Sequence, residues 1–197
     1  MSTNAYIVAA GGANYGSLRE ACRRIGVDAE LGDDPKRIAA ATHVILPGVG
    51  AAGHAMGVLR ERGLDSLLAR LTQPLLGICL GMQLLFERSD EDDVAGIGLL
   101  SGRVRRLPAA PSWPHMGWNT CDANARHPLL QGIATNDWFY FVHGYAAAPG
   151  SATIAESRHG DAFAAVVAQR NVHGVQFHPE KSGAPGRRVL TNFFALA

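Results

Sequence analysis

Apolar runs of strand length alternate with helix-like stripes throughout the first half of the chain. The apolar runs lie at 5–10, 27–31, 43–46 and 74–79. The stripes, in which apolar residues recur every three or four positions, lie at 18–25, 35–41 and 64–71. Short apolar runs are typical of buried strands, and the stripes are typical of helices that cover a sheet. The alternation therefore predicts a mostly parallel sheet with helices on both faces.

The second half of the chain has a different pattern. Its apolar and aromatic runs are short and close together, at 138–142, 152–156, 163–168 and 172–177. The last two runs flank 169–171 and predict a β-hairpin. A final stripe at 189–194 predicts a closing helix. We therefore expect a single α/β domain over residues 1–197, with additional antiparallel strands in its C-terminal half.

Composition and charge exclude several classes of protein. With 197 residues, of which 47% are hydrophobic, the chain is long enough to build one well-packed core. A formal net charge of +1 and no basic cluster argue against nucleic acid as the main partner. The apolar runs are too short to cross a membrane, and the first residues do not form a signal peptide. Three scattered cysteines indicate a reducing, cytoplasmic setting.

Two segments interrupt the alternation of strands and helices. The segment 89–93 contains four acidic residues and is expected to be a solvated loop. Pro108, Pro111 and Pro114 predict an irregular, exposed segment rather than a linker between domains. Neither segment changes the expectation of one domain.

The apolar run at 74–79 leads into a segment whose composition points to chemistry. Gly77, Cys79 and Gly81 form the cysteine version of the Gly-x-Ser-x-Gly nucleophile elbow, a sharp strand-to-helix turn. Its glycines allow the strand and the helix to approach closely. The amino end of the helix favours a thiolate and directs free N–H groups at an oxyanion. The alternative is a buried structural cysteine, which is the commoner role of a single cysteine.

A cysteine nucleophile needs a base, and the base needs a group that orients it. Among eight histidines, His178 has a suitable context because it follows a predicted strand that Pro179 ends sharply. Glu180 lies two positions further on, so its carboxylate can hold the far imidazole nitrogen. The alternative is a surface histidine and a surface glutamate beside a turn.

Cys79 and His178 lie about 100 positions apart, so no local contact can join them. They meet only if the strand at 172–177 lies near the strand at 74–79, with both carboxyl ends at the same edge of the sheet. This adjacency is a hypothesis about the fold.

A third candidate element is the segment 47–50, which follows a strand at the same predicted edge. Its glycines leave backbone N–H groups uncovered, and one of these could form an oxyanion hole together with the N–H of Leu80. The alternative is an ordinary glycine-rich turn between a strand and a helix.

Several of these segments resemble those of a known family. The stretches 77–83 and 176–180 look like the paired signatures of the class I (triad) glutamine amidotransferases. Within that family, one branch, the glutaminase subunits of imidazole glycerol phosphate synthase in histidine biosynthesis, is similar at 47–50, 114–119, 139–143 and 180–182. The likeness extends over 7–193, nearly the whole chain.

The resemblance implies a flavodoxin-like α/β fold and a catalytic triad of Cys79, His178 and Glu180. It places Gln83 against the substrate glutamine. The residues that it implies around the oxyanion are Gly48, Val49, Gly50 and Leu80. The implied activity is the hydrolysis of glutamine to glutamate and ammonia, and we expect neither a metal nor a cofactor.

The resemblance also implies a partner, a cyclase subunit with a (β/α)8 barrel that forms a heterodimer with this chain. In the family this barrel receives ammonia through an internal channel and is required for full glutaminase activity, and the 47–50 strand rearranges before it serves the oxyanion. His115 and Trp118 are expected at the interface or the channel mouth, and His143 is expected to be structural. Two departures are Ala9, where the family has aspartate, and Gly144, where it has serine.

Three alternative functions remain open at this point. The same glutaminase could serve another synthase, such as one that amidates a sugar. A cysteine hydrolase could act alone on γ-glutamyl bonds and would then be fully active without a partner. A non-catalytic flavodoxin-like binding module would keep its function when Cys79 is replaced by alanine.

Overall fold

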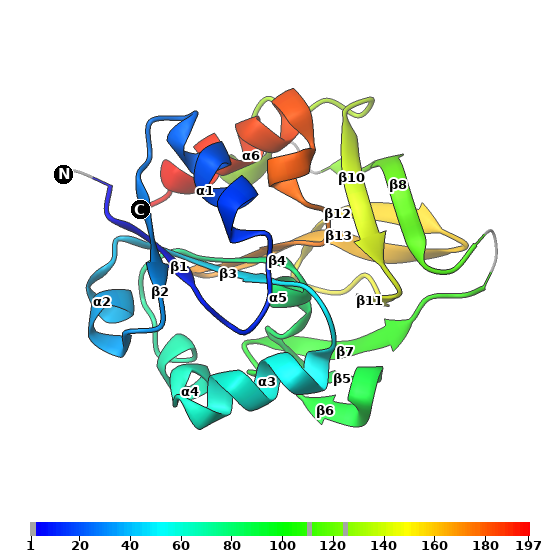
Figure 1. Cartoon of the computed structure of the whole chain (residues 1–197). Coiled ribbons are helices and arrows are strands. Elements are labelled where there is room, and N and C mark those ends of the chain that lie inside the picture. Colours follow the sequence, from blue (N-terminus) through cyan, green and yellow to red (C-terminus); the bar gives the residue numbers. More distant parts are fainter. Residues whose placement is uncertain (1–2, 110–111, 124–125) are drawn as a thin grey trace.

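The computed structural model describes residues 3–109, 112–123 and 126–197, and within them an eight-stranded sheet runs through the centre of the molecule (Figure 1). Its strands, in spatial order, are β2 (Ala29–Gly32), β1 (Ala5–Val8), β3 (His43–Gly48), β4 (Leu75–Cys79), β14 (Val172–Val175), β13 (Asp161–Gln169), β12 (Thr153–His159) and β9 (Asp122–Ala123). The first five are parallel, and the last three are antiparallel to their neighbours. The parallel part has the strand order of flavodoxin-like folds. The predicted α/β fold is confirmed.

Two smaller sheets flank the central one. One pairs β8 (His115–Thr120) with β10 (Trp138–His143) in antiparallel fashion. The other has the order β11 (Tyr145–Ala147), β7 (Leu100–Arg106), β5 (Phe86–Ser89) and β6 (Val94–Ala95). Both lie beside the antiparallel end of the central sheet in Figure 1 and frame one side of the candidate site.

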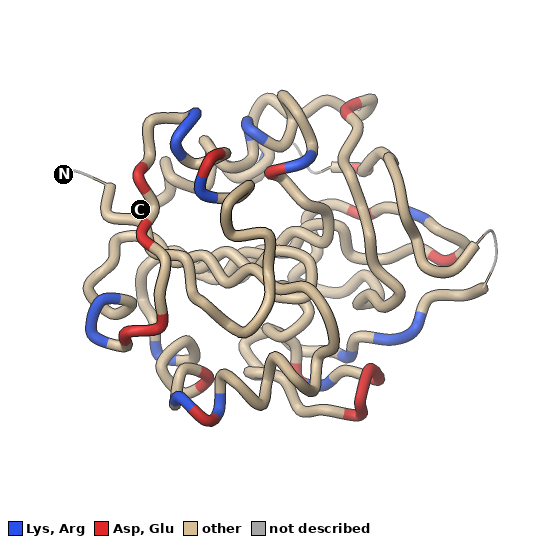
Figure 2. Tube along the Cα trace, viewed as in Figure 1, with Lys and Arg blue, Asp and Glu red and all other residues tan. Residues whose placement is uncertain are grey.

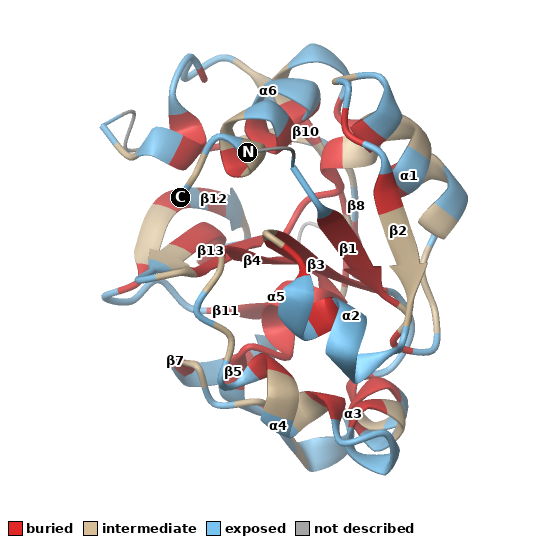
Figure 3. Cartoon of the chain, turned by 90° about the vertical axis from the view of Figure 1, so that its left-hand side faces the viewer, coloured by how far each residue is buried: buried red, intermediate tan, exposed pale blue. Residues whose placement is uncertain are grey.

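Helices cover both faces of the central sheet, as predicted (Figure 1). One face carries α1 (Tyr15–Arg23) and α6 (Gly183–Phe194), and the opposite face carries α2 (Pro35–Ala40), α3 (Ala52–Glu61), α4 (Leu64–Leu68) and α5 (Leu80–Gln83). Short 3-10 turns form η1 (Glu91–Asp93), η2 (Pro128–Leu130) and η3 (Pro179–Lys181). Figure 3 shows β1, β3 and β4 as buried strands between helices whose outer sides are exposed.

Side chains along each strand alternate between two hydrophobic cores. On β3, Ile45 belongs to the core beneath α1 and α6, whereas Val44 and Leu46 belong to the core beneath α3 and α4. Cys22 is fully buried on α1 and belongs to the first of these cores. Because both faces of β3 are covered, the strand reads as a continuous apolar run rather than an alternating one.

Two helical regions differ from the prediction. The helix α3 was not predicted, because glycine at positions 53 and 57 weakens helix propensity, although Ala52, Ala55, Met56 and Leu59 form its buried face. In the sequence, Leu80, Leu84 and Leu85 lie at helical spacing, which predicts a helix that continues through Leu85. Instead α5 has only four residues and ends at Gln83, and Phe86–Ser89 forms a strand. Leu84 and Leu85 are buried by tertiary packing after the helix has ended.

The irregular segment predicted around the prolines lies between β7 and β8, and Pro111 falls outside the described residues. Acidic and basic residues are interspersed along the chain trace in Figure 2, in agreement with 18 Lys and Arg against 17 Asp and Glu. Among the described residues, no helix has the length and apolar character that a membrane span requires.

The order of the strands places the candidate residues together. The strand β4 lies between β3 and β14, and all three are parallel. Gly48 is paired with Cys79, and Val175 is paired with Ile78, so three carboxyl ends meet at one edge. The strand adjacency required for Cys79 and His178 to meet is confirmed.

The turn between β4 and α5 depends on the absence of a side chain at Gly81, where an added Cβ would overlap the carbonyl oxygen of Leu46. We predict that Gly81→Ala lowers the free energy of unfolding by about 3 kcal/mol, because backbone atoms cannot move aside as a side chain can. Chemical denaturation followed by circular dichroism measures the change. The matched control is Gly57→Ala on α3, where an added Cβ meets no atom within 4 Å. It should raise the free energy of unfolding by about 1 kcal/mol, and equal effects of the two substitutions would contradict the prediction.

Candidate active site

Cys79 occupies a strained position between β4 and α5. Its φ of 53° and ψ of −112° lie outside the regions that residues other than glycine usually adopt. Strain of this kind persists only where the surrounding structure enforces it. The sharp turn predicted from the Gly-x-Cys-x-Gly spacing is therefore present.

The two flanking glycines explain how the turn is enforced. A Cβ at Gly77 would lie 2.7 Å from backbone atoms of Met82, inside the first turn of α5. A Cβ at Gly81 would overlap the carbonyl oxygen of Leu46 on β3. The helix therefore packs backbone against backbone on two neighbouring strands, and Cys79 is held where the three elements meet.

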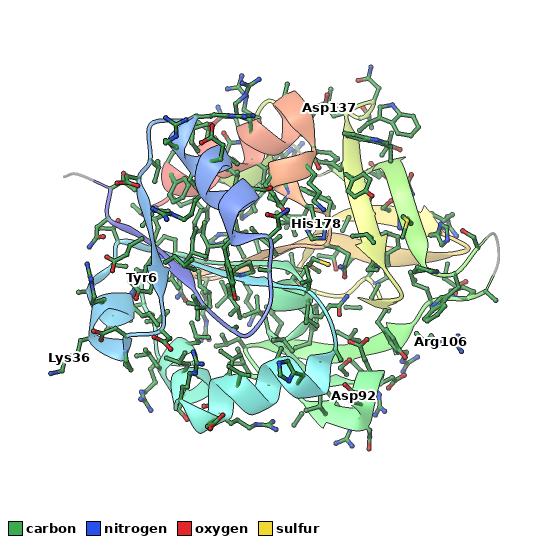
Figure 4. All side chains as sticks on the ribbon, in the orientation of Figure 1. Tyr6, Lys36, Asp92, Arg106, Asp137 and His178 are labelled. Carbon is green, nitrogen blue, oxygen red and sulfur yellow. The ribbon has the colours of Figure 1, made fainter. Side chains whose placement is uncertain are left out.

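His178 and Glu180 form a buried pair at the end of β14. The Nδ1 atom of His178 lies 2.9 Å from Oε1 of Glu180, and each side chain is 5% exposed. Because a carboxylate only accepts, Nδ1 of His178 carries the proton in this bond. Its Nε2 atom is buried without a hydrogen-bond partner among the described residues. Figure 4 shows His178 in the interior, whereas Lys36, Arg106 and Asp137 lie at the periphery.

The backbone around His178 is also fixed. Its N–H donates to the carbonyl of Tyr140 at 2.9 Å, and its own carbonyl accepts from the Ser182 hydroxyl at 2.7 Å. The Ser182 hydroxyl in turn accepts from the N–H of Tyr140 at 3.0 Å. The strand β10 and the turn η3 therefore hold the imidazole from both sides.

The charge state of His178 follows from its surroundings. Burial alone would lower the pKa of His178, but interactions with Cys79 and Glu180 outweigh burial and raise this pKa to about 10. The imidazole is therefore protonated at neutral pH. A protonated imidazole beside a cysteine can stabilise a thiolate and can later donate its proton to a leaving group.

A cleft of about 200 Å³ brings most of the predicted residues together. Its described lining consists of Val49, Gly50, Cys79, Leu80, Gln83, Glu91, Val142, His143, Gly144, Tyr145 and His178. Gly48 and Glu180 lie behind this lining, around a smaller cavity of about 10 Å³. The residues predicted for the triad, the substrate contact and the oxyanion site thus line this cleft or the cavity beside it.

The segment 47–50 does not offer the N–H of Val49 to the cleft. This N–H donates to the carbonyl of Gly12 at 3.0 Å and is therefore unavailable to a ligand. Gly50 has a φ of 94°, a conformation that only glycine adopts without strain. The role of this segment at the oxyanion stays a prediction, and for Val49 it requires that the bond to Gly12 break.

Gln83 lies on the wall of the cleft with its amide nitrogen fully used. Nε2 donates to the carbonyl of Tyr145 at 2.7 Å and to Oε1 of Gln176 at 3.0 Å. Its carbonyl oxygen accepts no hydrogen bond from the described residues. Gln83 can therefore meet a ligand only as an acceptor.

Glu91 lines the cleft although the sequence predicted a solvated loop for 89–93. Its Oε2 accepts from the N–H of Ala52 at 3.0 Å, and Asp92 accepts from the N–H of Gly53 at 3.0 Å. These bonds cap α3, whose own N-cap residue Ala51 has no polar side chain. Burial raises the pKa of Glu91. The signal available in the sequence was a helix start without a capping residue.

The histidines of the small β8–β10 sheet are buried and neutral. Nδ1 of His115 lies 3.0 Å from Nε2 of His143, and His115 stacks on Phe141. Burial lowers the pKa of His115 to about 4 and that of His143 to about 3. His115, expected at an interface, is therefore part of the interior, and His143 both supports the sheet and lines the cleft.

Of the two positions that depart from the family pattern, Gly144 has a structural explanation and Ala9 has none. An added Cβ at Gly144 would lie 2.7 Å from the indole of Trp113, whose Nε1 donates to the carbonyl of Gly144 at 2.9 Å. The indole therefore fills the space that a serine would need. Ala9 follows β1, and its N–H donates to the carbonyl of Gly32 at 2.8 Å. Nothing in the structure explains why this position carries no carboxylate.

No group of three histidine, cysteine, aspartate or glutamate residues within 3–109, 112–123 and 126–197 is arranged to hold a metal ion. All three cysteines are free and buried.

Comparison with known proteins identifies relatives over the whole length of the chain. Residues 12–197 match the family described as glutamine amidotransferase class-I. The chain is 49% identical over 196 residues to "Imidazole glycerol phosphate synthase subunit HisH" of Xylella fastidiosa, covering 98% of each chain. It is 45% identical over 192 residues to the protein of that name from Haemophilus influenzae, covering 97% of this chain and 96% of the relative.

Solved structures show the same fold at low sequence identity. The structure titled "Crystal structure of glutamine amidotransferase" superimposes with a TM-score of 0.76 at 19% identity, over 98% of this chain and 100% of the other. The structure of PurLQS from Thermotoga maritima gives a TM-score of 0.69, also at 19% identity, over 99% of each chain.

The raised pKa of His178 predicts how its contribution to stability depends on pH. An unfolded histidine titrates near pH 6.5, so the folded state retains this proton while the unfolded state loses it. The difference in unfolding free energy between the unmodified chain and His178→Gln should therefore be largest below about pH 6.5 and should shrink as pH rises towards about 10. Urea denaturation at several pH values measures it.

His173 serves as the control, because its contribution to stability should change with pH in the opposite direction. Burial lowers the pKa of His173 to about 4, so its contribution should shrink as pH falls from about 6.5 towards 4. A His178 contribution that grows with rising pH, or the same trend for both histidines, would disprove the assignment of a protonated His178.

Proposed function

The chain belongs to the class-I glutamine amidotransferase family, and from this we propose that it is the glutaminase subunit of an imidazole glycerol phosphate synthase in histidine biosynthesis. In this role it hydrolyses glutamine to glutamate and ammonia and supplies the ammonia to a cyclase subunit. The observation that carries the proposal is the meeting of Cys79 with His178, held by Glu180, at one cleft. The near full-length similarity to HisH proteins supports the pathway.

The first half of the reaction forms a covalent intermediate. The Cys79 thiolate attacks the side-chain amide carbon of glutamine, and a carbon–sulfur bond forms as the carbonyl oxygen becomes an oxyanion. His178, protonated at neutral pH, donates its proton to the amide nitrogen, and the carbon–nitrogen bond breaks to release ammonia. Glu180 stabilises the imidazolium and keeps its Nε2 directed at the cleft.

The second half regenerates the enzyme. His178, now neutral, accepts a proton from water, and the resulting hydroxide attacks the glutamyl thioester. The carbon–sulfur bond breaks, glutamate leaves, and the Cys79 thiolate is again paired with protonated His178. The same imidazole thus acts as an acid in one half-reaction and as a base in the other.

Recognition of an amino-acid substrate needs an anionic group for its ammonium. Glu91 is the acidic side chain among the described residues that line the cleft, and only its Oε2 is bound, to the N–H of Ala52. Its other oxygen and the carbonyl oxygen of Gln83 belong to side chains that line the same cleft, and both can act as acceptors. We assign this pair to the α-ammonium of glutamine.

The resting conformation of 47–50 implies a slow free subunit. The N–H of Leu80 at the start of α5 can serve the oxyanion, but the N–H of Val49 is bound to Gly12. Loss of one oxyanion donor costs on the order of 3 kcal/mol, or about a hundredfold in rate. Rotation of one peptide between Gly48 and Val49 would supply the second donor, and we assign this rotation to partner binding.

The surface beside the cleft suits a protein partner. On the β8–β10 sheet, side chains alternate, so that Phe139, Phe141 and His143 point inward while Trp118, Trp138 and Met116 are exposed by 53%, 54% and 64%. Val142 belongs to the outer set and also lines the cleft. Exposed aromatic residues around a cleft mouth are typical of interfaces. We propose that the (β/α)8-barrel cyclase docks here, forms a heterodimer and takes up ammonia, and that the complex is cytoplasmic.

The proposal predicts a glutaminase whose rate depends on its partner. The purified chain should hydrolyse glutamine slowly, and addition of the cyclase subunit should raise the rate about a hundredfold, because the second oxyanion donor then becomes available. Glutamate release measures the rate, and Cys79→Ser should abolish it with and without the partner. A full rate from the isolated chain would favour an autonomous γ-glutamyl hydrolase. Stimulation only by a sugar-amidating synthase would assign the chain to that pathway instead.

The assignment of Glu91 predicts a binding defect rather than a chemical one. Glu91→Gln keeps an oxygen for the N–H of Ala52 but removes the charge, so KM for glutamine should rise at least tenfold with little change in kcat. Steady-state kinetics of the complex measures both. The neighbouring Asp92→Asn is the matched control, because Asp92 also caps α3 but does not line the cleft. Equal changes in KM for both variants would refute the assignment.

A further inference from the structure

Behind the nucleophile lies a buried amide that bonds, among the described side chains, to Cys79 and Gln83. Gln176 directly follows β14 and is 0% exposed. Its Nε2 atom lies 3.7 Å from the Cys79 sulfur, and its Oε1 atom accepts from Gln83 at 3.0 Å. A buried amide is costly unless its polar atoms are bonded. Here both ends of the amide are hydrogen-bonded, the oxygen to Gln83 and the nitrogen to the sulfur of Cys79.

The direction of this amide is determined by a chain of hydrogen bonds. The carbonyl of Tyr145 can only accept, and it receives Nε2 of Gln83 at 2.7 Å and Nδ1 of His143 at 2.9 Å. The second N–H of Gln83 therefore donates to Gln176, and the side-chain oxygen of Gln176 accepts this bond. The remaining end of Gln176, its NH2 group, faces the sulfur of Cys79. The assignment does not depend on a choice between oxygen and nitrogen.

We propose that Gln176 stabilises the Cys79 thiolate by donating a hydrogen bond to its sulfur, with Gln83 and the Tyr145 carbonyl holding the amide in place. This inference rests on the proposed function in one respect, the role of Cys79 as nucleophile. Gln176 touches the reacting atom, whereas Gln83 acts through Gln176 in this respect and is a positioning residue for it.

The donor favours the anion over the thiol. As a thiol, Cys79 directs its hydrogen at the carbonyl of Val142, 3.7 Å away. When the proton leaves, that carbonyl faces a negative charge, whereas the bond from Gln176 becomes charge-assisted and stronger. Gln176 is completely buried, so water does not compete with the sulfur for its NH2 group.

Other sources of stabilisation are weak or separable. The helix α5 has only four residues, so its dipole contributes less than that of a long helix. Among the described residues, the titratable groups that line the cleft with Cys79 are His178 at the end of β14, His143 on β10, Tyr145 on β11 and Glu91 on η1, and Glu180 acts through His178. All five remain when Gln176 alone is replaced, so a comparison isolates the amide.

The test measures the reactivity of Cys79 directly. Gln176→Met keeps the approximate size of the side chain but removes the donor. The full chain is treated with iodoacetamide between pH 4 and pH 10, and mass spectrometry follows alkylation at Cys79. The pH at which Cys79 becomes reactive should rise by about one unit, the usual size of one hydrogen bond to a charged group. Unchanged reactivity in a folded Gln176→Met protein would overturn the proposal.

Matched controls separate the effect from general disturbance. Gln73→Met replaces a half-buried glutamine that donates to the carbonyls of Ile38 and Ala39. This substitution should leave the reactivity of Cys79 unchanged. Within the same samples, burial raises the pKa of both Cys22 and Cys121 to about 12, so these two cysteines should stay unreactive. Reaction at either of them would report a loosened fold.

A second variant and a second measurement cover the case in which Gln176→Met does not fold. Gln176→Glu has nearly the same shape but places a carboxylate beside the sulfur, and the reactive pH should rise by more than in Gln176→Met. In the unmodified chain, the NMR signal of the Gln176 side-chain amide, observed after isotope labelling of glutamine, should shift with the same midpoint as Cys79 alkylation. It should not shift in Cys79→Ser. A Gln176 amide signal that does not shift when Cys79 loses its proton would overturn the proposal.

Kinetics of the complex with the cyclase separate this proposal from the proposed function. Alkylation needs neither glutamine nor partner, so a shifted profile in a chain without glutaminase activity would support Gln176 and refute the activity. Where activity is present, Gln176→Met should lower kcat about tenfold and leave KM for glutamine unchanged, because Gln176 touches the sulfur and not the substrate. A change in KM alone would assign Gln176 to substrate binding instead.

Discussion

The close contact between α5 and β3 is the constraint on which the site depends. Gly81 lies against the carbonyl of Leu46, and this contact forces the chain to turn at Cys79 with a φ of 53°. Any side chain at the contact would push the helix away and relax the turn. Because β4 is paired on its other side with β14, the same turn brings the sulfur to the edge where His178 emerges. One backbone contact therefore fixes a nucleophile relative to a base that lies about 100 residues further along the chain.

Electrostatics at this edge divides the buried polar groups into two kinds. His178 keeps its proton because Glu180 and Cys79 outweigh burial, whereas nothing comparable faces His143, which stays neutral. The Tyr145 carbonyl accepts from His143 and Gln83 and so links the neutral group to the nucleophile. Charged and neutral buried groups thus lie side by side, and neutral hydrogen bonds hold the backbone around the charged pair of His178 and Glu180.

Much of this arrangement follows from local sequence, and the remainder depends on distant contacts. The turn at Cys79 could be predicted because a sharp strand-to-helix turn requires glycines beside it. The strands that meet at this edge of the sheet could be predicted from their apolar runs. Glu91 could not, because its carboxylate caps α3, a helix that begins 39 positions earlier. The resting bond of Val49 to Gly12 could not be predicted either, because it joins two loops. Sequence patterns report burial and turns well but do not report which polar group a loop will meet.

The indole of Trp113 fills the space beside Gly144, a residue without a side chain on the wall of the cleft. It occupies the volume beside Gly144 and binds the carbonyl of that residue, 31 positions away in the chain. The two positions are therefore linked: a larger residue at 144 would collide with the ring, and a residue without an N–H donor at 113 would leave the carbonyl of Gly144 without this bond. Such a pair is expected to change in concert during evolution. A serine at 144 would require a smaller residue at 113 as well.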